Sequence, residues 1–146
     1  TMIMSRTDSR AVYGIDDAIE RTKRYIDAGA EICFADGIGT REELEKFAKE
    51  LSGSGAYLVA NMIEGGKTPL IPAKELEQMG FSLVFWACSA VYTISKALYD
   101  LFGNLAQDGT TEKSLDRMIE FSQFNSMIGL DTYKEYERKY KVDRDD

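Results

Sequence analysis

The sequence contains no histidine, and this absence restricts its chemistry more than any other feature of its composition. Histidine is the commonest general base near neutral pH and the commonest metal ligand, so catalysis by these residues would have to use carboxylates, cations and amides. Only two cysteines are present, Cys33 and Cys88, and both lie in apolar runs. So small a number argues against a disulfide-rich secreted scaffold and favours two buried thiols.

Long apolar runs and an excess of positive charge are also lacking. No segment approaches the roughly 20 apolar residues that a membrane span needs, and no charged-then-apolar leader is visible. The formal net charge is −7 and is spread along the chain rather than collected in blocks, which argues against a nucleic-acid or anionic membrane partner. We therefore expect no nucleic-acid binding, no membrane association and a cytoplasmic location.

What the chain does contain is a repeated plan of strands and helices. Its 146 residues, 44% of them hydrophobic, suffice for one ordinary domain with a substantial core. Four short apolar runs are typical of strands; they start at Met2, Glu31, Tyr57 and Leu83, and so lie 29, 26 and 26 residues apart. The sequence therefore predicts four successive strand–helix units.

The intervals between the apolar runs carry apolar residues at helical spacing. We expect helices over residues 16–28, 40–51 and 72–80, and a longer one from about Ser89. Gly29 stands where a helix commonly needs a left-handed terminal residue. The faces expected to be buried are Ala18, Ile19, Thr22, Tyr25 and Ile26 in the first helix and Leu44, Phe47, Ala48 and Leu51 in the second. In the last helix, Val91, Ile94, Leu98, Leu101 and Leu105 lie at helical spacing.

Apolar strands alternating with helices indicate a parallel sheet, for which two architectures compete. A doubly wound nucleotide-binding sheet needs a glycine fingerprint after an early strand, and residues 5–14 (SRTDSRAVYG) lack one. A (βα)8 barrel takes roughly 250 residues, and four units here take about half of that. We therefore predict an α/β fold, the C-terminal half of a TIM barrel, with its last four βα units over residues 1–106. Met2 would then lie in an interior strand whose predecessors are outside this sequence.

Function in such a barrel collects where the strands end. Arg6 and Asp8 follow the first expected strand, Asp36 the second, residues 61–68 (NMIEGGKT) the third and residues 86–89 (WACS) the fourth. An arginine in this place either pairs with a nearby carboxylate such as Asp8 or clamps a substrate carboxylate with its planar fork. Asp36 either caps the next helix, orients the arginine or relays a proton.

The third of these loops is open to two interpretations as well. The amide of Asn61 can donate to an oxyanion or form an Asx turn. Gly65 and Gly66 allow the backbone to approach an anion closely, and they equally suit a flexible loop.

Several separated motifs resemble the isocitrate lyase and phosphoenolpyruvate mutase superfamily in their order and spacing. They are SRTDSR (5–10), GIDDAIERTKRYIDAGAEICFADG (14–37), ANMIEGGKTPL (60–70) and LEQMGFSLVFWACSA (76–90). The segment from Gly109 to Tyr140 resembles the C-terminal helices of the superfamily, which we expect over residues 107–146. The resemblance is greatest to the short lyases acting on 2-methylisocitrate, 2,3-dimethylmalate or oxaloacetate, and to the carboxyvinyl-carboxyphosphonate phosphorylmutases.

The resemblance implies a Mg²⁺-dependent carbon–carbon (oxo-acid) lyase that cleaves a small 2-hydroxy or 2-oxo dicarboxylate through an enolate. A phosphonate or carboxyphosphonoenolpyruvate phosphorylmutase is an alternative, and a non-catalytic half-barrel binding module is another. The Mg²⁺ ligands and the catalytic-loop cysteine are expected in the N-terminal half, outside this sequence, so this chain alone is expected to be inactive. Since the family commonly forms tetramers, we expect a homo-oligomer or pairing with the N-terminal half.

The resemblance also implies roles for individual residues. Arg6 and Asp36 match catalytic positions; Arg6 would hold a substrate carboxylate, and Asp36 stands where many relatives carry glutamate. The expected substrate-binding residues are Arg6, Asn61, Met62, Ile63, Thr68 and Ser89. Tyr92 stands where some methylisocitrate lyases carry arginine, which favours a malate derivative or oxaloacetate over a tricarboxylate.

Overall fold

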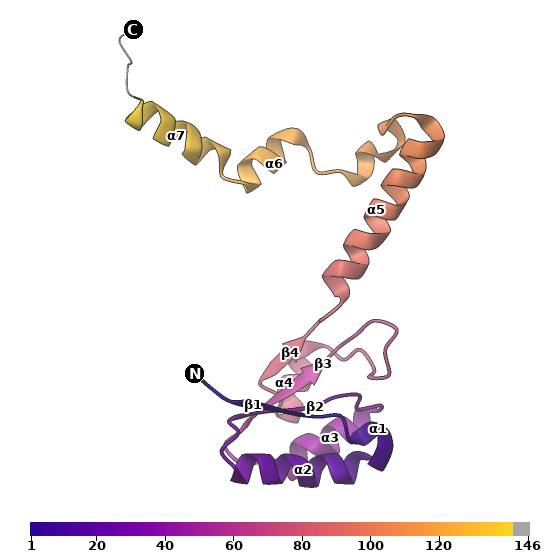
Figure 1. Ribbon diagram of the computed structural model, residues 1–146, viewed down its shortest axis with the longest axis vertical. Helices are drawn as coiled ribbons and strands as arrows, with labels where there is room; N and C mark the ends of the chain where they lie inside the picture. The colour runs from indigo at the N-terminus through magenta and orange to yellow at the C-terminus, as the bar shows by residue number, and fades with distance from the viewer. Residues whose placement is uncertain (142–146) are drawn as a thin grey trace. The chain divides into compact units, whose positions relative to one another are not determined.

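The computed structural model describes residues 1–141, and the chain divides into two compact units, Thr1–Ser95 and Lys96–Asp146. The first unit contains the strands β1 (Met4–Thr7), β2 (Ile32–Ala35), β3 (Tyr57–Asn61) and β4 (Leu83–Phe85) and the helices α1 (Arg10–Tyr13), α2 (Ile15–Asp27), α3 (Arg41–Glu50) and α4 (Ala73–Met79). Helix α5 (Ser89–Asp108) follows β4 and continues into the second unit (Figure 1).

The four strands form one parallel sheet in the order β1-β2-β3-β4. The sequence prediction of parallel strands that neighbour one another in chain order is thus confirmed. Because all four strands run in the same direction, Arg6, Asp36, Asn61 and Ser89 lie at, or just beyond, the same edge of the sheet.

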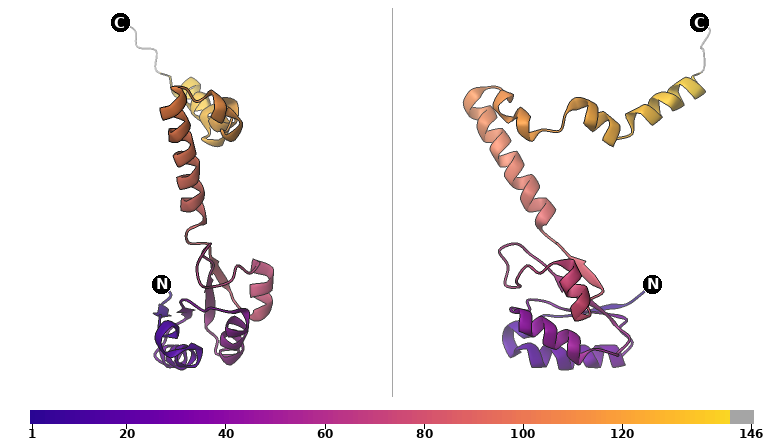
Figure 2. Two further views of the ribbon diagram at one scale, coloured as in Figure 1. Left: turned by 90° about the vertical axis from the view of Figure 1, so that its right-hand side faces the viewer. Right: turned by 180° about the vertical axis from the view of Figure 1, so that it is seen from behind.

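Helices α2, α3 and α4 lie on the same face of this sheet (Figures 1 and 2). Between them and the strands lies the hydrophobic core, which includes Ala18, Ile19, Cys33, Ala35, Leu44, Phe47, Ala48, Leu51, Leu58, Ala60, Leu76 and Phe81. Phe47 of α3 is fully buried and stacks on Phe81, with ring centroids 6.4 Å apart. The buried faces predicted for α2 and α3 are confirmed at Ala18, Ile19 and Thr22 and at Leu44, Phe47, Ala48 and Leu51.

The opposite face of the sheet carries the alternate residues of each strand, including Arg6, Phe34 and Asn61. Four large apolar side chains on this face are exposed: Met4, Tyr57, Leu83 and Phe85. Parallel sheets are normally covered on both faces, so this is the face that the predicted barrel would enclose. Phe34 is protected there, since its ring meets that of Phe85 edge-on at 6.3 Å between centroids.

Two local features differ from the sequence predictions. An additional turn of helix, α1, follows β1 and ends at Gly14, whose φ of 86° lies in the left-handed region that glycine tolerates. Cys33 is buried as predicted, and burial raises the pKa of its thiol. The prediction of a second buried thiol was wrong, because Cys88 lies in the turn after β4, where it is only partly covered.

The second unit is helical over most of its described residues. After α5 come a 3-10 turn, η1 (Glu112–Arg117), and helices α6 (Phe121–Met127) and α7 (Leu130–Tyr140). The Asn104 amide donates to the buried Ser114 hydroxyl at 3.1 Å and so joins η1 to α5. The part of the predicted helical segment over 142–146 lies outside the described residues, and the boundary after residue 106 stays a prediction.

Helix α5 differs from α2, α3 and α4 in its burial. None of its residues, all of which the structure describes, is fully buried. The exposed apolar side chains of α5 include Val91, Ile94, Leu98, Phe102 and Leu105. The apolar residues at helical spacing in α5 are therefore not buried by the other described residues. Between residues 1 and 141, no helix combines the length and apolar character needed to cross a bilayer.

Candidate functional site

A cavity of about 220 Å³ opens where β1, β2 and β3 end. Its walls include Asp8, Asp36, Asn61, Ile63, Lys67 and Thr68. These residues come from three loops that are far apart in sequence, and the loops converge because they follow adjacent parallel strands. The volume lies below the usual range for drug-sized ligands and suits a small molecule.

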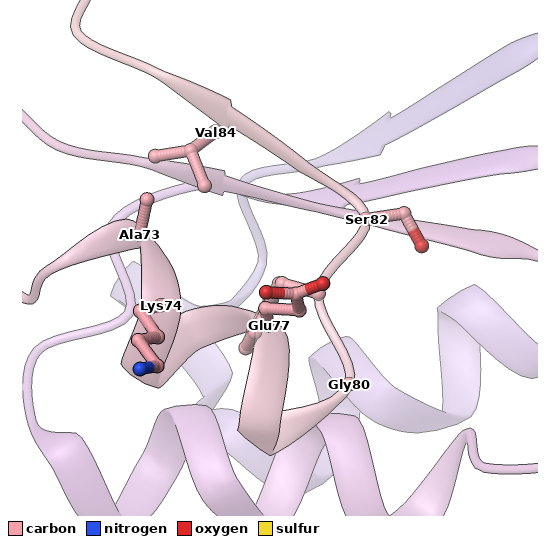
Figure 3. Close-up of a pocket in the computed structure, with 7 residues that line it drawn as sticks. Ala73, Lys74, Glu77, Gly80, Ser82 and Val84 are labelled. Carbon is pink, nitrogen blue, oxygen red and sulfur yellow. The ribbon is translucent and has the colours of Figure 1, made fainter.

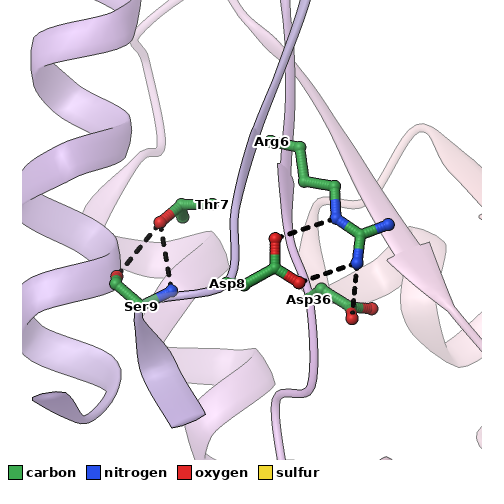
Figure 4. Close-up of polar contacts among 5 residues, drawn as sticks. All are labelled: Arg6, Thr7, Asp8, Ser9 and Asp36. Carbon is green, nitrogen blue, oxygen red and sulfur yellow. Dashed lines mark hydrogen bonds and ion pairs between the residues drawn. The ribbon is translucent and has the colours of Figure 1, made fainter. Parts of the chain in front are cut away.

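Arg6 contacts two carboxylates that line this cavity (Figure 4). Its Nε and Nη2 donate to Oδ2 and Oδ1 of Asp8 at 3.0 and 2.7 Å, and Nη2 also donates to Oδ2 of Asp36 at 2.9 Å. The guanidinium carbon lies 5.1 Å from the centroid of the Phe34 ring. These contacts fix the guanidinium plane and leave Nη1 without a hydrogen bond to any residue between 1 and 141.

Electrostatics keep Arg6 and Asp8 ionised near neutral pH. The hydrogen bond from Arg6 lowers the pKa of the Asp8 carboxyl, and the same bond raises the pKa of Arg6. Because the two side chains are 52% and 62% exposed, solvent screens the pair. Asp8 therefore orients the arginine more than it stabilises the fold. The ion pair that the sequence allowed for Arg6 is present, and the substrate clamp stays a prediction.

Backbone contacts place the two carboxylates beside Arg6. The Asp36 N–H donates to the carbonyl of Thr7 at 2.9 Å and so continues the β1–β2 ladder beyond the strand. The Thr7 hydroxyl accepts the N–H of Ser9 at 3.2 Å and donates to the Ser9 hydroxyl at 3.0 Å, which turns the chain from β1 into α1 (Figure 4). Hydrogen bonds thus hold the backbone of both loops at the positions of Asp8 and Asp36.

The end of β3 and the loop after it carry two buried polar atoms that lack hydrogen-bond partners within the described residues: Oδ1 of Asn61 and Oε2 of Glu64. The unpaired oxygen of Asn61 belongs to a residue that lines the cavity, where it is available to a ligand or water donor. The other oxygen of Glu64 accepts a hydrogen bond from the Ser89 hydroxyl, which lowers the pKa of Glu64. This bond ties the loop to the first residue of α5.

The structure brings most of the predicted site residues together. Asp36, Asn61, Ile63 and Thr68 line the cavity, and Arg6 contacts one of them. Ser89 is not among the lining residues, and its contact is with Glu64.

Met62 lies elsewhere. It is fully buried in the core beneath the helices, where its Sδ accepts the N–H of Ile71 at 3.4 Å. Neighbouring residues along an extended chain point to opposite faces, so Asn61 and Met62 cannot both face the cavity.

Two charged lining residues, Asp8 and Lys67, were not among the predicted site residues. Asp8 was considered only as a partner of Arg6, although its place two residues beyond a strand-end arginine was the available signal. Lys67 lies in the glycine-containing loop after β3, where a lysine gives no pattern that distinguishes a site from a solvated surface.

The described residues do not form a Mg²⁺ site by themselves. Among residues 1–141, no group of three or more Asp, Glu, His or Cys side chains is arranged to hold a metal ion. Asp8 and Asp36 both accept hydrogen bonds from Arg6, so a cation already compensates their charge.

A second, more open hollow of about 750 Å³ runs along α4 and β4 (Figure 3). Lys74, Glu77, Ser82 and Val84 are among the residues that line it, and it shares none with the cavity. It includes the α4–β4 connection, which enters the amino end of β4. This hollow therefore does not extend the site at the carboxyl edge.

Comparison with known proteins identifies this arrangement. Residues 1–106 match the model of the family described as phosphoenolpyruvate phosphomutase. The chain belongs to this family. The resemblance to the phosphoenolpyruvate mutase/isocitrate lyase superfamily, predicted from separated motifs, is thereby confirmed.

Several named members of the superfamily are similar over nearly the whole chain. The chain is 40% identical over 143 residues to 2,3-dimethylmalate lyase of Eubacterium barkeri, covering 98% of this chain and 48% of that protein. It is 39% identical over 141 residues to the chloroplastic carboxyvinyl-carboxyphosphonate phosphorylmutase of Arabidopsis thaliana, covering 94% and 41%. The chain thus spans about half the length of these relatives.

Solved structures agree with this relationship. A crystal structure of 2,3-dimethylmalate lyase superposes with a TM-score of 0.80 at 29% identity, covering 94% of this chain and 47% of that chain. A structure of oxaloacetate acetylhydrolase in complex with oxalate gives a TM-score of 0.82 at 23% identity, which shows the shared fold. The predicted α/β fold with a parallel sheet, matching about half of a superfamily TIM barrel, is therefore confirmed.

Proposed function

We propose that the complete protein is a carbon–carbon lyase that cleaves a small 2-hydroxy or 2-oxo dicarboxylate, such as a malate derivative, methylisocitrate or oxaloacetate, through an enolate. The observation that carries this proposal is that Asp36 and Asn61 line one small cavity and that Arg6, from the neighbouring strand, donates a hydrogen bond to Asp36. The 40% identity to a 2,3-dimethylmalate lyase over 143 residues supports it. This chain would contribute the substrate-binding half.

Each residue of the cluster has a distinct task in this proposal. Arg6 holds the substrate carboxylate next to the bond that breaks, using the Nη1 donor that no described residue occupies, while Asp8 and Asp36 fix the plane of its guanidinium. Asn61 donates its amide to the oxygen on which negative charge develops. Ile63 and Thr68 shape the remaining wall.

We further propose Mg²⁺ as the cofactor, since the superfamily is metal-dependent. Its ligands would come from outside this chain, because the described residues do not form a site for it. A bound Mg²⁺ supplies positive charge that stabilises a developing oxyanion. The residues of this chain bind and orient the carboxylate in either case.

A phosphorylmutase is the second candidate. The 39% identity to a carboxyvinyl-carboxyphosphonate phosphorylmutase and the description of the matching family both favour it. A half-barrel that binds carboxylates without catalysis is the third candidate. All three hold an anion at the carboxyl edge of the sheet, so turnover on defined substrates distinguishes them.

We expect the complete protein to cleave at least one of 2,3-dimethylmalate, oxaloacetate and 2-methylisocitrate when Mg²⁺ is present, and to lose this activity on chelation. Product formation followed by proton NMR measures all three reactions in one format. The 146-residue chain alone is the matched control and should give no turnover. Rearrangement of a phosphonate substrate without cleavage of these acids would favour the mutase, and carboxylate binding without any turnover would favour the binding module.

We also propose that the chain self-associates through α5, whose exposed apolar residues include Leu98 and Phe102. Sedimentation at micromolar concentration is expected to show species larger than the 16.4 kDa monomer. The double variant Leu98→Lys/Phe102→Lys should shift this distribution toward monomer, whereas Tyr133→Lys on α7 should not. A wild-type chain that sediments as a stable monomer would contradict the proposal.

The cytoplasmic location stays a prediction.

A further inference from the structure

One ion pair outside the cavity joins the loops that follow β1 and β2. Arg10 is the first residue of α1, and Glu43 lies in the first turn of α3. Nε and Nη2 of Arg10 donate to Oε2 and Oε1 of Glu43 at 3.0 and 3.1 Å. The side chains are only 23% and 22% exposed, so this pair is better shielded from water than the Arg6–Asp8 pair. Two hydrogen bonds from one guanidinium to one carboxylate fix the relative orientation of the two side chains as well as their distance.

The same pair holds the backbone of the β2–α3 loop. Oε2 of Glu43 also accepts the N–H of Gly39 at 2.8 Å. A Cβ added to Gly39 would overlap the guanidinium of Arg10, so this side chain lies directly against the loop. A side chain at position 39 would therefore have to displace the Arg10 guanidinium from its place against the loop.

The other end of this loop carries a residue of the candidate site. The N–H of Asp36 donates to the carbonyl of Thr7, and its carboxylate accepts from Arg6 at 2.9 Å. Ile38 lies between the two ends and is buried. Residues 36–39 are therefore held against the segment that leaves β1, at Asp36 by Thr7 and at Gly39 by the Arg10–Glu43 pair.

We propose that Arg10 and Glu43 are positioning residues, which place the Asp36 carboxylate against Arg6 by holding the β2–α3 loop at Gly39. Neither residue lines the cavity, so neither touches a ligand there. The structural part of this inference concerns the chain itself. Its catalytic consequence rests on the proposed function.

Amide hydrogen exchange in the 146-residue chain tests the structural part without any need for activity. In Arg10→Gln, the amides of Gly39 and Asp36 should exchange about tenfold faster than in the wild type, while the core amides of β3 keep their rates. Arg10→Lys retains the positive charge but not the planar guanidinium. Its Gly39 and Asp36 amides should exchange at rates between those of the wild type and those of Arg10→Gln. Arg41→Gln is the matched control, because it removes another arginine–glutamate pair of α3, with Glu75, that does not contact this loop.

The double variant Arg10→Gln/Glu43→Gln separates a paired role from two independent ones. If the two side chains act together, the Gly39 amide of the double variant should exchange no faster than it does in the faster-exchanging of the single variants Arg10→Gln and Glu43→Gln. Unchanged exchange at Gly39 and Asp36 in Arg10→Gln would overturn the inference. An equal rise at all amides, β3 included, would also overturn it, because it would show global destabilisation only.

In the complete protein, the same Arg10→Gln change is expected to lower kcat/KM about tenfold at unchanged thermal midpoint, with partial rescue by Arg10→Lys. If the wild-type protein cleaves none of the acids, the proposed function fails while the exchange result still decides the positioning role. If the wild type is active and Arg10→Gln keeps its kcat/KM, the catalytic part of the inference is wrong.

Discussion

Replacing Arg6 by lysine is expected to lower kcat/KM of the complete protein by about 30- to 1,000-fold on its best carboxylate substrate. This corresponds to about 2 to 4 kcal/mol, the range for a lost charge-assisted contact in a reacting site. Arg6 serves three acceptors at once in this proposal: Asp8 and Asp36 through Nε and Nη2, and the substrate through Nη1. Lysine presents a single ammonium group that cannot reproduce this planar arrangement.

Two further variants make this result specific. Asp36→Glu should lose far less activity, because it keeps a carboxylate that can accept a hydrogen bond from Arg6. Arg41→Lys alters an arginine that pairs with Glu75 on the surface of α3 and α4, and it should leave kcat/KM unchanged. Wild-type kcat/KM in Arg6→Lys would show that Arg6 forms a structural ion pair and does not bind the substrate.

Replacing Phe47 by alanine is expected to destabilise the N-terminal unit by about 3 to 5 kcal/mol, a large part of the stability of an ordinary domain. Phe47 of α3 is fully buried in the core, and its ring stacks on that of Phe81. Its removal leaves a cavity that the surrounding helices fill only partly.

Urea unfolding measures this effect through Trp86, the single tryptophan, which lies in the N-terminal unit. The matched control is Phe121→Ala, since Phe121 is 84% exposed and should contribute little to stability. A midpoint in Phe47→Ala equal to that of the control would contradict the described core.

The sequence predicted the strands and the helices of the N-terminal unit from periodicity and helix ends. Residues such as Leu44, Phe47 and Ala48 repeat at helical spacing, and their burial follows directly from that spacing. The extra helix α1 was missed because a single turn is too short to give a periodic signal. The partial exposure of Cys88 was missed because an apolar run does not show where its strand ends.

The candidate site was predictable at the level of strand ends and less so for single side chains. A residue after each strand reaches the carboxyl edge in any parallel sheet, so Arg6, Asp36 and Asn61 could be named from their positions. Whether the next residue joins them depends on the direction in which the chain leaves the strand. Met62 leaves β3 toward the core, whereas Ile63 and Thr68 return to the cavity.

The sequence by itself thus determined the order of elements, the parallel sheet, the family and the edge at which the site lies, because each depends on local periodicity or on motifs within short segments. Only the tertiary structure decided which atoms meet: that Asp8 and Asp36 share the guanidinium of Arg6, and that Arg10 reaches Glu43. Such contacts join residues up to 33 positions apart along the chain. They depend on the register and twist of the sheet, and no local pattern in the sequence specifies those.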